Sequence, residues 1–152
     1  MTVTGTYLPA GLPAPAPRRD GLDGPYWDAA RRHELVCQRC SACGGFQWGP
    51  EWICHDCLSF DVGWQPVAPH GRIFSWERAW HPVHPVLREA CPYVVVLVEL
   101  PHAGGVRMIG NLIGEPRQQI TIGAPVDALF EDHDDVDPPY TLIQWRTSDD
   151  PR

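Results

Sequence analysis

Two closely spaced cysteine pairs constrain this chain more than any other feature. Cys40 and Cys43 form the first pair, Cys54 and Cys57 form the second, and a short segment joins them. Two Cys-x-x-Cys pairs at this separation can deliver four thiolates to one tetrahedral ion. A segment of this size cannot bury enough apolar surface to fold alone, and metal binding supplies the missing free energy, on the order of 10–16 kcal/mol in zinc-finger peptides. Because four thiolates leave no open coordination position, the sequence predicts a structural rather than a catalytic metal site.

The choice of the first pair depends on the residue that follows it. Cys37 and Cys40 have the same spacing as Cys40 and Cys43, but only Cys43 is followed by a glycine, Gly44. Glycine accepts the positive φ that such a turn often needs. We therefore expect Cys37 to be a buried apolar thiol, with the swapped pair as the alternative, and predict as ligands Cys40, Cys43, Cys54 and Cys57. Zinc is the expected ion, and iron would accept the same four sulfur atoms.

Proline and turn residues divide the chain into four regions. Seventeen prolines argue against long helices. Residues 1–22 are expected to form an extended, proline-rich arm, which is either a disordered tail or docks on a partner or on its own body. Residues 23–36 predict a short helix with Asp23 as its N-cap and Pro25 in its first turn. The cysteine module follows over residues 37–66.

Residues 67–148 predict a β domain. The expected strands cover residues 72–80, 93–100, 106–113, 124–131 and 141–146, and a turn cluster after the second strand predicts a hairpin with the third. Phe74, Trp76, Arg78 and Trp80 should share one face of the first strand. Five short strands suit a small closed barrel, for which the OB fold is the common five-stranded choice. The predicted fold class is therefore mostly β, with one N-terminal helix.

The charge and hydropathy of the chain disfavour several classes of partner. The net charge is −7, whereas binding to nucleic acid depends largely on Lys and Arg that neutralise phosphates. No apolar run reaches the roughly 18 residues that a membrane span needs, and no signal peptide is visible. We therefore expect a cytoplasmic protein that binds neither nucleic acid nor membrane. Residues 131–137 are acidic but lack the ligand order of a calcium loop, so a solvated turn is expected there.

The chain resembles the acyl-CoA-associated OB-fold family, long labelled a domain of unknown function. The resemblance covers about residues 24 to 146. Its motifs, in chain order, are Tyr26-Trp27, Gln38-Arg39-Cys40, Cys43-Gly44, Pro50 before Cys54, Gly71-Arg72-Ile73-Phe74-Ser75, Pro92-Tyr93-Val94-Val95-Val96, Gly110-Asn111-Leu112 and Ile122-Gly123-Ala124-Pro125-Val126. Leu58 departs from the family, whose members usually have glycine at that position.

This resemblance implies both a fold and a role. The implied fold is an N-terminal helix, a rubredoxin-like zinc ribbon and a C-terminal OB-fold barrel. The implied role is that of a non-catalytic accessory subunit in a hetero-oligomer, bound to a thiolase-like or hydratase partner, with acyl-CoA at the shared interface. Such a complex would support acyl-CoA or steroid-CoA metabolism. The alternatives are a module that binds single-stranded nucleic acid and an independent acyl-CoA hydratase-like enzyme.

Two histidines and three arginines are the remaining candidates for contact with a partner or with acyl-CoA. His81 and His84 lie between the first two predicted strands, in a connection that often contributes to binding in OB folds. No carboxylate or serine stands at a catalytic spacing from them. Arg72, Arg78 and Arg88 could meet the phosphates of CoA, although an isolated arginine on a barrel is more often solvated. We therefore expect a contact surface here rather than an active site.

Overall fold

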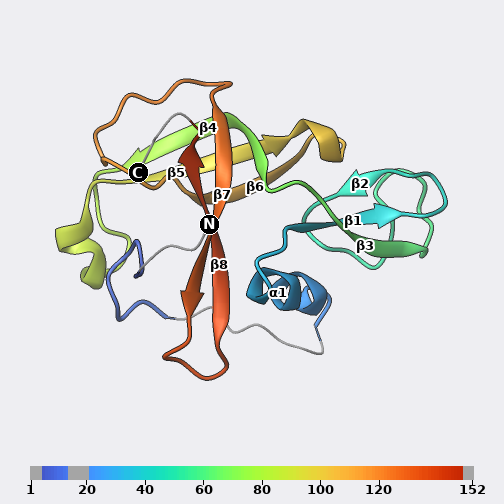
Figure 1. Cartoon of the computed structure of the whole chain (residues 1–152), viewed down its shortest axis with the longest axis horizontal. Coiled ribbons are helices and arrows are strands. Elements are labelled where there is room, and N and C mark those ends of the chain that lie inside the picture. Colours follow the sequence, from blue (N-terminus) through green and yellow to red (C-terminus); the bar gives the residue numbers. More distant parts are fainter. Residues whose placement is uncertain (1–4, 14–20, 149–152) are drawn as a thin grey trace.

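The computed structural model describes residues 5–13 and 21–148 (Figure 1). Its elements, in chain order, are α1 (Gly24–Arg31), β1 (Val36–Cys40), β2 (Phe46–Gln47), β3 (Val62–Pro66), β4 (His70–Ala79), the 3-10 helix η1 (Pro85–Ala90), β5 (Tyr93–Leu100), the 3-10 helix η2 (Pro101–Ala103), β6 (Val106–Asn111), β7 (Pro125–His133) and β8 (Tyr140–Thr147). The strands form a three-stranded sheet and a five-stranded sheet. In Figure 1 the small sheet lies to one side of the barrel, and α1 lies beside both.

The helix α1 is shorter than the sequence predicts. It ends at Arg31, whereas the prediction extended it to residue 36. His33 adopts a positive φ of 59°, and the N–H of Glu34 donates to the carbonyl oxygen of Ala29 at 3.0 Å. This left-handed turn reverses the chain, so that the next residues enter β1. Asp23 occupies the N-cap position, but its carboxylate accepts a hydrogen bond from Trp27 Nε1 at 2.7 Å rather than from the helix backbone.

The five-stranded sheet closes into the predicted OB-type barrel. Its strand order is β6-β5-β4-β7-β8, and the two outer strands meet where Leu112 forms a parallel bridge with Trp145. The N–H of Ile113 donates to the carbonyl oxygen of Trp145 at 2.7 Å. Gly110 permits this approach, because a Cβ atom there would lie 2.8 Å from the Trp145 ring. The fold class predicted from the sequence is therefore confirmed.

A β-bulge in β4 separates aromatic residues that the sequence places on one face. The pairing with β5 shifts between Ile73 and Ser75, which leaves Phe74 in the bulge. Trp76 then stands opposite Val96, whose side chain is fully buried. Phe74 lies on the outer face, where the Arg107 guanidinium stacks 3.5 Å above its ring. The prediction of one shared face is wrong, because a bulge inserts an extra residue and breaks the period-two alternation.

The hydrophobic core fills the barrel and extends to α1 and β1. From outside the barrel strands it includes Ala30, Leu35 and Cys37, and from the barrel it includes Ile73, Val94, Val96, Val98, Leu100, Ala103, Met108, Leu112, Val126, Ala128, Phe130, Ile143 and Trp145. Burial of these side chains is the dominant favourable term in folding. None of the helices among the described residues has the length and apolar character needed to cross a membrane.

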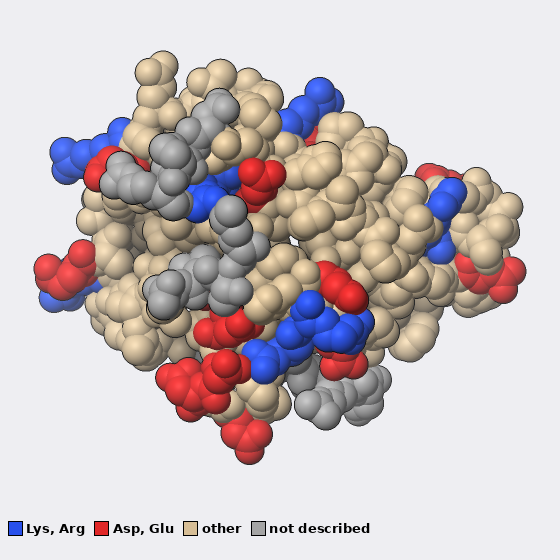
Figure 2. All heavy atoms as spheres, viewed as in Figure 1, with Lys and Arg blue, Asp and Glu red and all other residues tan. Residues whose placement is uncertain are grey.

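The acidic stretch at the β7–β8 hairpin is only partly solvated. Charged side chains gather beside α1 and the end of this hairpin (Figure 2), where Arg31 pairs with Asp134 at 2.8 Å and His33 with Asp132 at 2.9 Å. Glu131, by contrast, is only 2% exposed. The predicted solvated turn is therefore wrong at residues 131–133, because these residues belong to β7 and the side chain of Glu131 faces the protein.

Candidate metal centre

The structure brings together the four sulfur atoms that we predict as ligands. Cys40 ends β1, Cys43 follows in the turn before β2, and Cys54 and Cys57 lie in the loop before β3. All four Sγ atoms lie within 4.8 Å of one another. The Cys40–Cys57 and Cys43–Cys54 Sγ distances are both 3.6 Å. Tetrahedral zinc with Zn–S bonds of about 2.3 Å sets its sulfurs about 3.8 Å apart, so the cluster fits a zinc ion.

The two cysteine turns have the same backbone geometry. In the first, the N–H of Gly44 donates to the carbonyl oxygen of Cys40 at 2.9 Å, and in the second, the N–H of Leu58 donates to that of Cys54 at 3.1 Å. Gly44 has a φ of 78° and Leu58 a φ of 61°. A left-handed conformation costs a residue with a side chain about 1–2 kcal/mol. Leu58 therefore holds backbone strain in the second turn, whereas Gly44 holds none at the equivalent position of the first turn.

Backbone hydrogen bonds favour the thiolate form of Cys54, the first cysteine of the second turn. The N–H groups of Cys57 and Asp56 donate to the Cys54 sulfur and lower the pKa of its thiol to about 7. A lowered pKa favours the deprotonated form, which is the form that binds metal. Cys37, in contrast, is fully buried in the barrel core, and burial raises the pKa of its thiol to about 12. Its environment is that of the apolar thiol predicted from the sequence.

Two buried glutamines hold the loop that carries Cys54. Gln38 Oε1 accepts hydrogen bonds from Gln47 Nε2 at 2.8 Å and from the N–H of Glu51 at 2.9 Å, while Gln38 Nε2 donates to the Glu51 carbonyl oxygen at 3.1 Å. Gln47 in turn donates to the carbonyl oxygen of Ile53 at 3.2 Å and accepts from the N–H of His55 at 2.9 Å. The sequence predicts this role for neither glutamine, although Gln38 stands in a family motif, because no motif links a glutamine to backbone groups in a distant loop.

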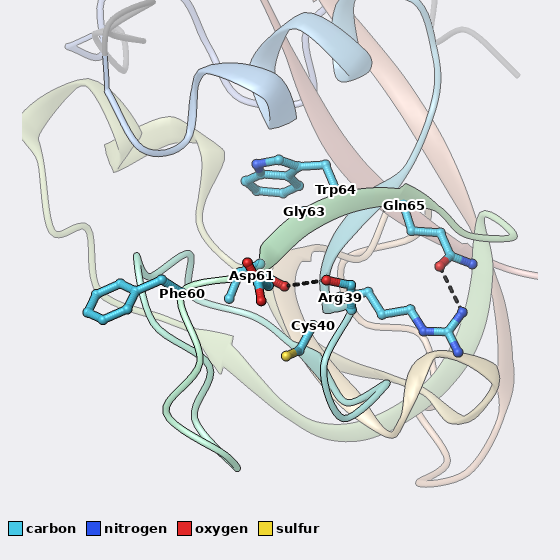
Figure 3. A pocket seen from close by; sticks show the side chains of 9 residues that line it. Arg39, Cys40, Phe60, Asp61, Gly63, Trp64 and Gln65 are labelled. Atoms are coloured by element: carbon cyan, nitrogen blue, oxygen red, sulfur yellow. Dashed lines mark hydrogen bonds between the residues drawn. The ribbon is translucent and has the colours of Figure 1, made fainter.

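An open hollow of about 540 Å³ lies beside the metal centre, along β3. In Figure 3 the Phe60 and Trp64 rings project on one side of the hollow, and Arg39 and Gln65 lie on the other. Arg39 Nη1 donates to Gln65 Oε1 at 2.9 Å, and the Phe60 side chain is among the most exposed of the large hydrophobic groups, at 78%. The hollow therefore presents aromatic surface next to Cys40, which also lines it.

The structure does not bring the predicted contact arginines into one site. Arg72 donates to the Glu99 carboxylate at 2.9 Å on the outer face of the barrel, and this contact lowers the pKa of Glu99. Arg78 stands opposite buried Val94 on the other face of β4, where it donates to the carbonyl oxygens of Pro116 and Gln118 in the loop before β7. Both side chains are therefore engaged within the chain and point in different directions.

The remaining candidates lie in the β4–β5 connection. His84 caps η1, because its Nδ1 accepts the N–H of Val86 at 3.3 Å. His81 and Arg88 are exposed, and within the described part of the chain neither has an ion pair. No carboxylate lies within hydrogen-bond distance of either histidine among those residues. The connection therefore has the character of an exposed contact loop.

The chain combines a ribbon that carries four clustered thiols with a five-stranded barrel. This combination defines the class of zinc-ribbon and OB-fold proteins. The rubredoxin-like zinc ribbon domain of ChsH2 matches residues 27–63, and the C-terminal OB-fold domain of ChsH2 matches residues 64–131. The chain therefore belongs to the ChsH2 zinc-ribbon and OB-fold family, known as DUF35. This confirms the family resemblance stated from the sequence.

Two curated relatives and two solved structures are similar to this chain. A probable enoyl-CoA hydratase alpha subunit of Thermomonospora curvata is 39% identical over 135 residues, which are 88% of this chain and 39% of the relative. The 3-oxo-4,17-pregnadiene-20-carboxyl-CoA hydratase alpha subunit of Mycobacterium tuberculosis is 30% identical over 152 aligned positions, covering 91% of this chain and 45% of the relative. The chain thus spans less than half the length of either relative.

Among solved structures, a chain of the Ltp2-ChsH2(DUF35) aldolase matches with a TM-score of 0.73 and 37% identity, covering 89% of this chain and 99% of that one. A Sulfolobus solfataricus protein of unknown function from the DUF35 family matches with a TM-score of 0.57 and 13% identity, covering 85% of this chain and 87% of that one. The second match shows the fold alone.

Proposed function

We propose that this chain is a non-catalytic accessory subunit that binds a thiolase-fold enzyme, of thiolase or steroid side-chain aldolase type, and supports acyl-CoA or steroid-CoA metabolism. One observation carries the proposal: the chain matches almost the whole length of a chain in the Ltp2-ChsH2(DUF35) aldolase at 37% identity. Identity at this level over a complete subunit supports a similar role in assembly. The fold alone would not, because OB folds host many functions.

The chemistry of the described residues supports a non-catalytic role. The cysteine cluster offers four sulfur ligands, and a closed site of this kind leaves no position for substrate. The two histidines between β4 and β5 lack a carboxylate partner among the described residues. A general acid or base needs a group that positions it and tunes its pKa. The partner enzyme would therefore supply the reacting groups.

Zinc is the metal that we propose for the centre, held by Cys40, Cys43, Cys54 and Cys57. Bound there, it would cross-link the two turns and stabilise the ribbon. Metal analysis of the purified chain tests both the site and the ion. Cys40→Ser should remove the metal, whereas Cys91→Ser, at a half-buried cysteine outside the cluster, should retain about one equivalent. Iron in place of zinc would give the absorption bands of a ferric tetrathiolate.

We assign contact with the partner or its acyl-CoA to the β4–β5 connection. It carries His81, His84 and Arg88, and it exposes Val83 at 85% of its surface. Arg88 is the arginine best suited to an external phosphate, because Arg72 and Arg78 already donate to groups of this chain. Arg88→Ala should weaken complex formation or raise the KM for acyl-CoA, and Arg32→Ala, at an exposed residue of the helix end, is its control.

A second candidate function is that of an independent acyl-CoA hydratase. It is favoured by the names of the two curated relatives, both of which are hydratase alpha subunits. The chain spans less than half of each relative, however, so the hydratase activity of those proteins need not reside in the shared part. The purified chain incubated with enoyl-CoA substrates separates the two proposals, since only a hydratase would hydrate them unaided.

The test of the accessory role is co-expression with a thiolase-fold enzyme from the same genome, followed by size-exclusion chromatography with mass determination. We expect a defined hetero-oligomer, no acyl-CoA turnover by this chain alone, and turnover by the complex. Two proteins that elute separately with each candidate enzyme would refute the proposal. Oligonucleotide binding at physiological salt would instead favour a nucleic-acid module, which the net charge of −7 opposes.

A further inference from the structure

The N-terminal residues 5–13 touch two connections of the part of the barrel with which OB folds usually bind their ligands. That part consists of the second and third strands and two connections, here β4–β5 and β7–β8. Thr6 and residues 8–13 line a cavity whose barrel wall comes mostly from β7 and β8. The barrel residues that line it are Asn111, Glu131, His133, Asp135, Val136, Tyr140, Leu142 and Gln144. At Gly11 an added Cβ would lie 3.1 Å from the Val86 side chain of the β4–β5 connection. This segment, which we name the strap, therefore covers a groove along β7 and β8, next to the two connections that bind ligands in OB folds.

A buried carboxylate anchors the strap. Glu131 is 2% exposed, and its Oε2 accepts the backbone N–H of Tyr7 at 3.1 Å. The same carboxylate accepts hydrogen bonds from His133 at 2.8 Å and from Gln144 at 3.1 Å. Burial of the strap's own tyrosine against the barrel raises the pKa of the Tyr7 hydroxyl. Glu131 therefore presents an oriented acceptor for a backbone N–H while its other partners belong to the barrel.

The strap is held less tightly than an integral part of the fold. A partly open cavity of about 190 Å³ remains between it and the barrel wall, so part of the facing surfaces is not in contact. The strap pairs with no strand of the barrel. Because His133 and Gln144 satisfy Glu131 from within the barrel, the groove would keep its shape if the strap left it.

We propose that this groove is a binding site for an extended, uncharged peptide segment, and that residues 5–13 occupy it as an intramolecular ligand. The strap sequence Gly-Thr-Tyr-Leu-Pro-Ala-Gly-Leu-Pro contains no charged residue, which suits a groove that carries Glu131 and Asp135. Its prolines reduce the entropy lost when an extended segment binds. The same acidic groups and the occupied groove oppose nucleic acid, which would bring further negative charge to this face.

The test uses the full-length, metal-loaded chain and a fluorescent synthetic peptide with the sequence of residues 5–13. In the wild type the attached strap competes at an effective concentration in the millimolar range, so the added peptide should bind weakly. Gly11→Ala weakens the strap without altering the barrel, because Gly11 has a φ of 102° and its new methyl group would press on Val86. We expect this variant to bind the peptide at least tenfold more tightly than the wild type does.

Two further variants make the test specific. Gly5→Ala is the matched control for the contact with Val86, since Gly5 has a similar φ of 93° and so the same backbone strain, but nothing within 4 Å of the added Cβ. It should raise peptide affinity clearly less than Gly11→Ala does. Adding Glu131→Gln to Gly11→Ala should weaken peptide binding about tenfold, because hydrogen bonds to charged acceptors are the stronger ones. If that double variant does not fold, the comparison between the two glycine variants decides alone.

A second readout follows the strap itself. Hydrogen exchange of the Tyr7 amide should be at least tenfold slower than in the free peptide, and Gly11→Ala should remove most of this protection. A Tyr7 amide that exchanges at the free-peptide rate in the wild type would overturn the proposal. So would a Gly11→Ala chain that binds no peptide at millimolar concentration, because the strap would then be a fixed part of the fold.

Discussion

Replacement of Gln38 by alanine should impair metal binding although Gln38 is not a ligand. The side chain of Gln38 is 3% exposed and makes three hydrogen bonds, one to the Gln47 side chain and two to the backbone of Glu51. Through them β1, which ends in Cys40, holds the loop that leads to Cys54. Alanine would free this loop and leave its backbone groups without these partners.

The expected cost follows from the number of hydrogen bonds. Each intramolecular hydrogen bond contributes about 1 kcal/mol net, and a buried group left without a partner costs more. Loss of the three bonds should therefore destabilise the ribbon by about 3 kcal/mol. Because metal binding and folding of such modules are coupled, and 1.4 kcal/mol corresponds to a factor of ten, the apparent zinc affinity should fall by about 100-fold.

Competition with a chromophoric zinc chelator measures this affinity directly. Gln65→Ala is the matched control, because Gln65 lies in the adjacent strand β3 and, among the residues that the structure describes, its side chain bonds only to the exposed Arg39. We expect that variant to bind zinc within about threefold of the wild type, since surface changes usually stay within ±0.5 kcal/mol. A Gln38→Ala chain with the zinc affinity of the wild type would refute the role of the glutamine network.

Three further outcomes are expected. Leu58→Gly should stabilise the ribbon by about 0.5–1 kcal/mol in urea denaturation. The reason is that relief of about 1–2 kcal/mol of left-handed strain exceeds the entropic cost of glycine. A loss of stability would mean that packing of the leucine side chain outweighs the strain. The Arg72 contact lowers the pKa of Glu99, so its stabilisation is present above the ordinary carboxylate pKa and is lost as pH falls through the lowered value. Wild type and Glu99→Gln should therefore differ in thermal midpoint at pH 7 and converge as the pH falls below the ordinary carboxylate range, and a difference that stays constant over this range would contradict the assignment. Excess chelator should remove amide protection from β2 and β3 and also lower the thermal midpoint of the barrel, whereas an unchanged barrel midpoint would show that the two sheets are independent.

The sequence predicts β5 to the residue because a near-continuous apolar run, interrupted only by Glu99, lies there between Pro92 and Pro101. Proline ends a strand locally, so the neighbouring residues alone decide the boundaries. The four-cysteine cluster can also be predicted from the sequence, because the spacing of its cysteines is fixed by the geometry of one ion. Both features depend on residues close together in the chain.

Features that depend on distant residues could not be predicted in this way. The end of α1 is set by the left-handed conformation of His33, which stacks on Phe130 of β7. The bulge at Phe74 depends on the register with β5, where Arg107 of β6 also meets its ring. Glu131 lies in an acidic stretch and is nevertheless buried, because the strap covers it. In each case a tertiary contact overrides what the neighbouring residues favour.

The short strand β1 limits how this protein can be divided. The family descriptions divide the chain between residues 63 and 64, yet Leu35 and Cys37, on the ribbon side of that boundary, are buried in the same core as Ile73 and Trp145 of the barrel. A fragment that begins at the boundary would leave this part of the barrel open to water, and a ribbon fragment would expose two side chains that are now almost fully buried. The unit that can be moved between proteins, or fused to another enzyme, is therefore the helix, ribbon and barrel together.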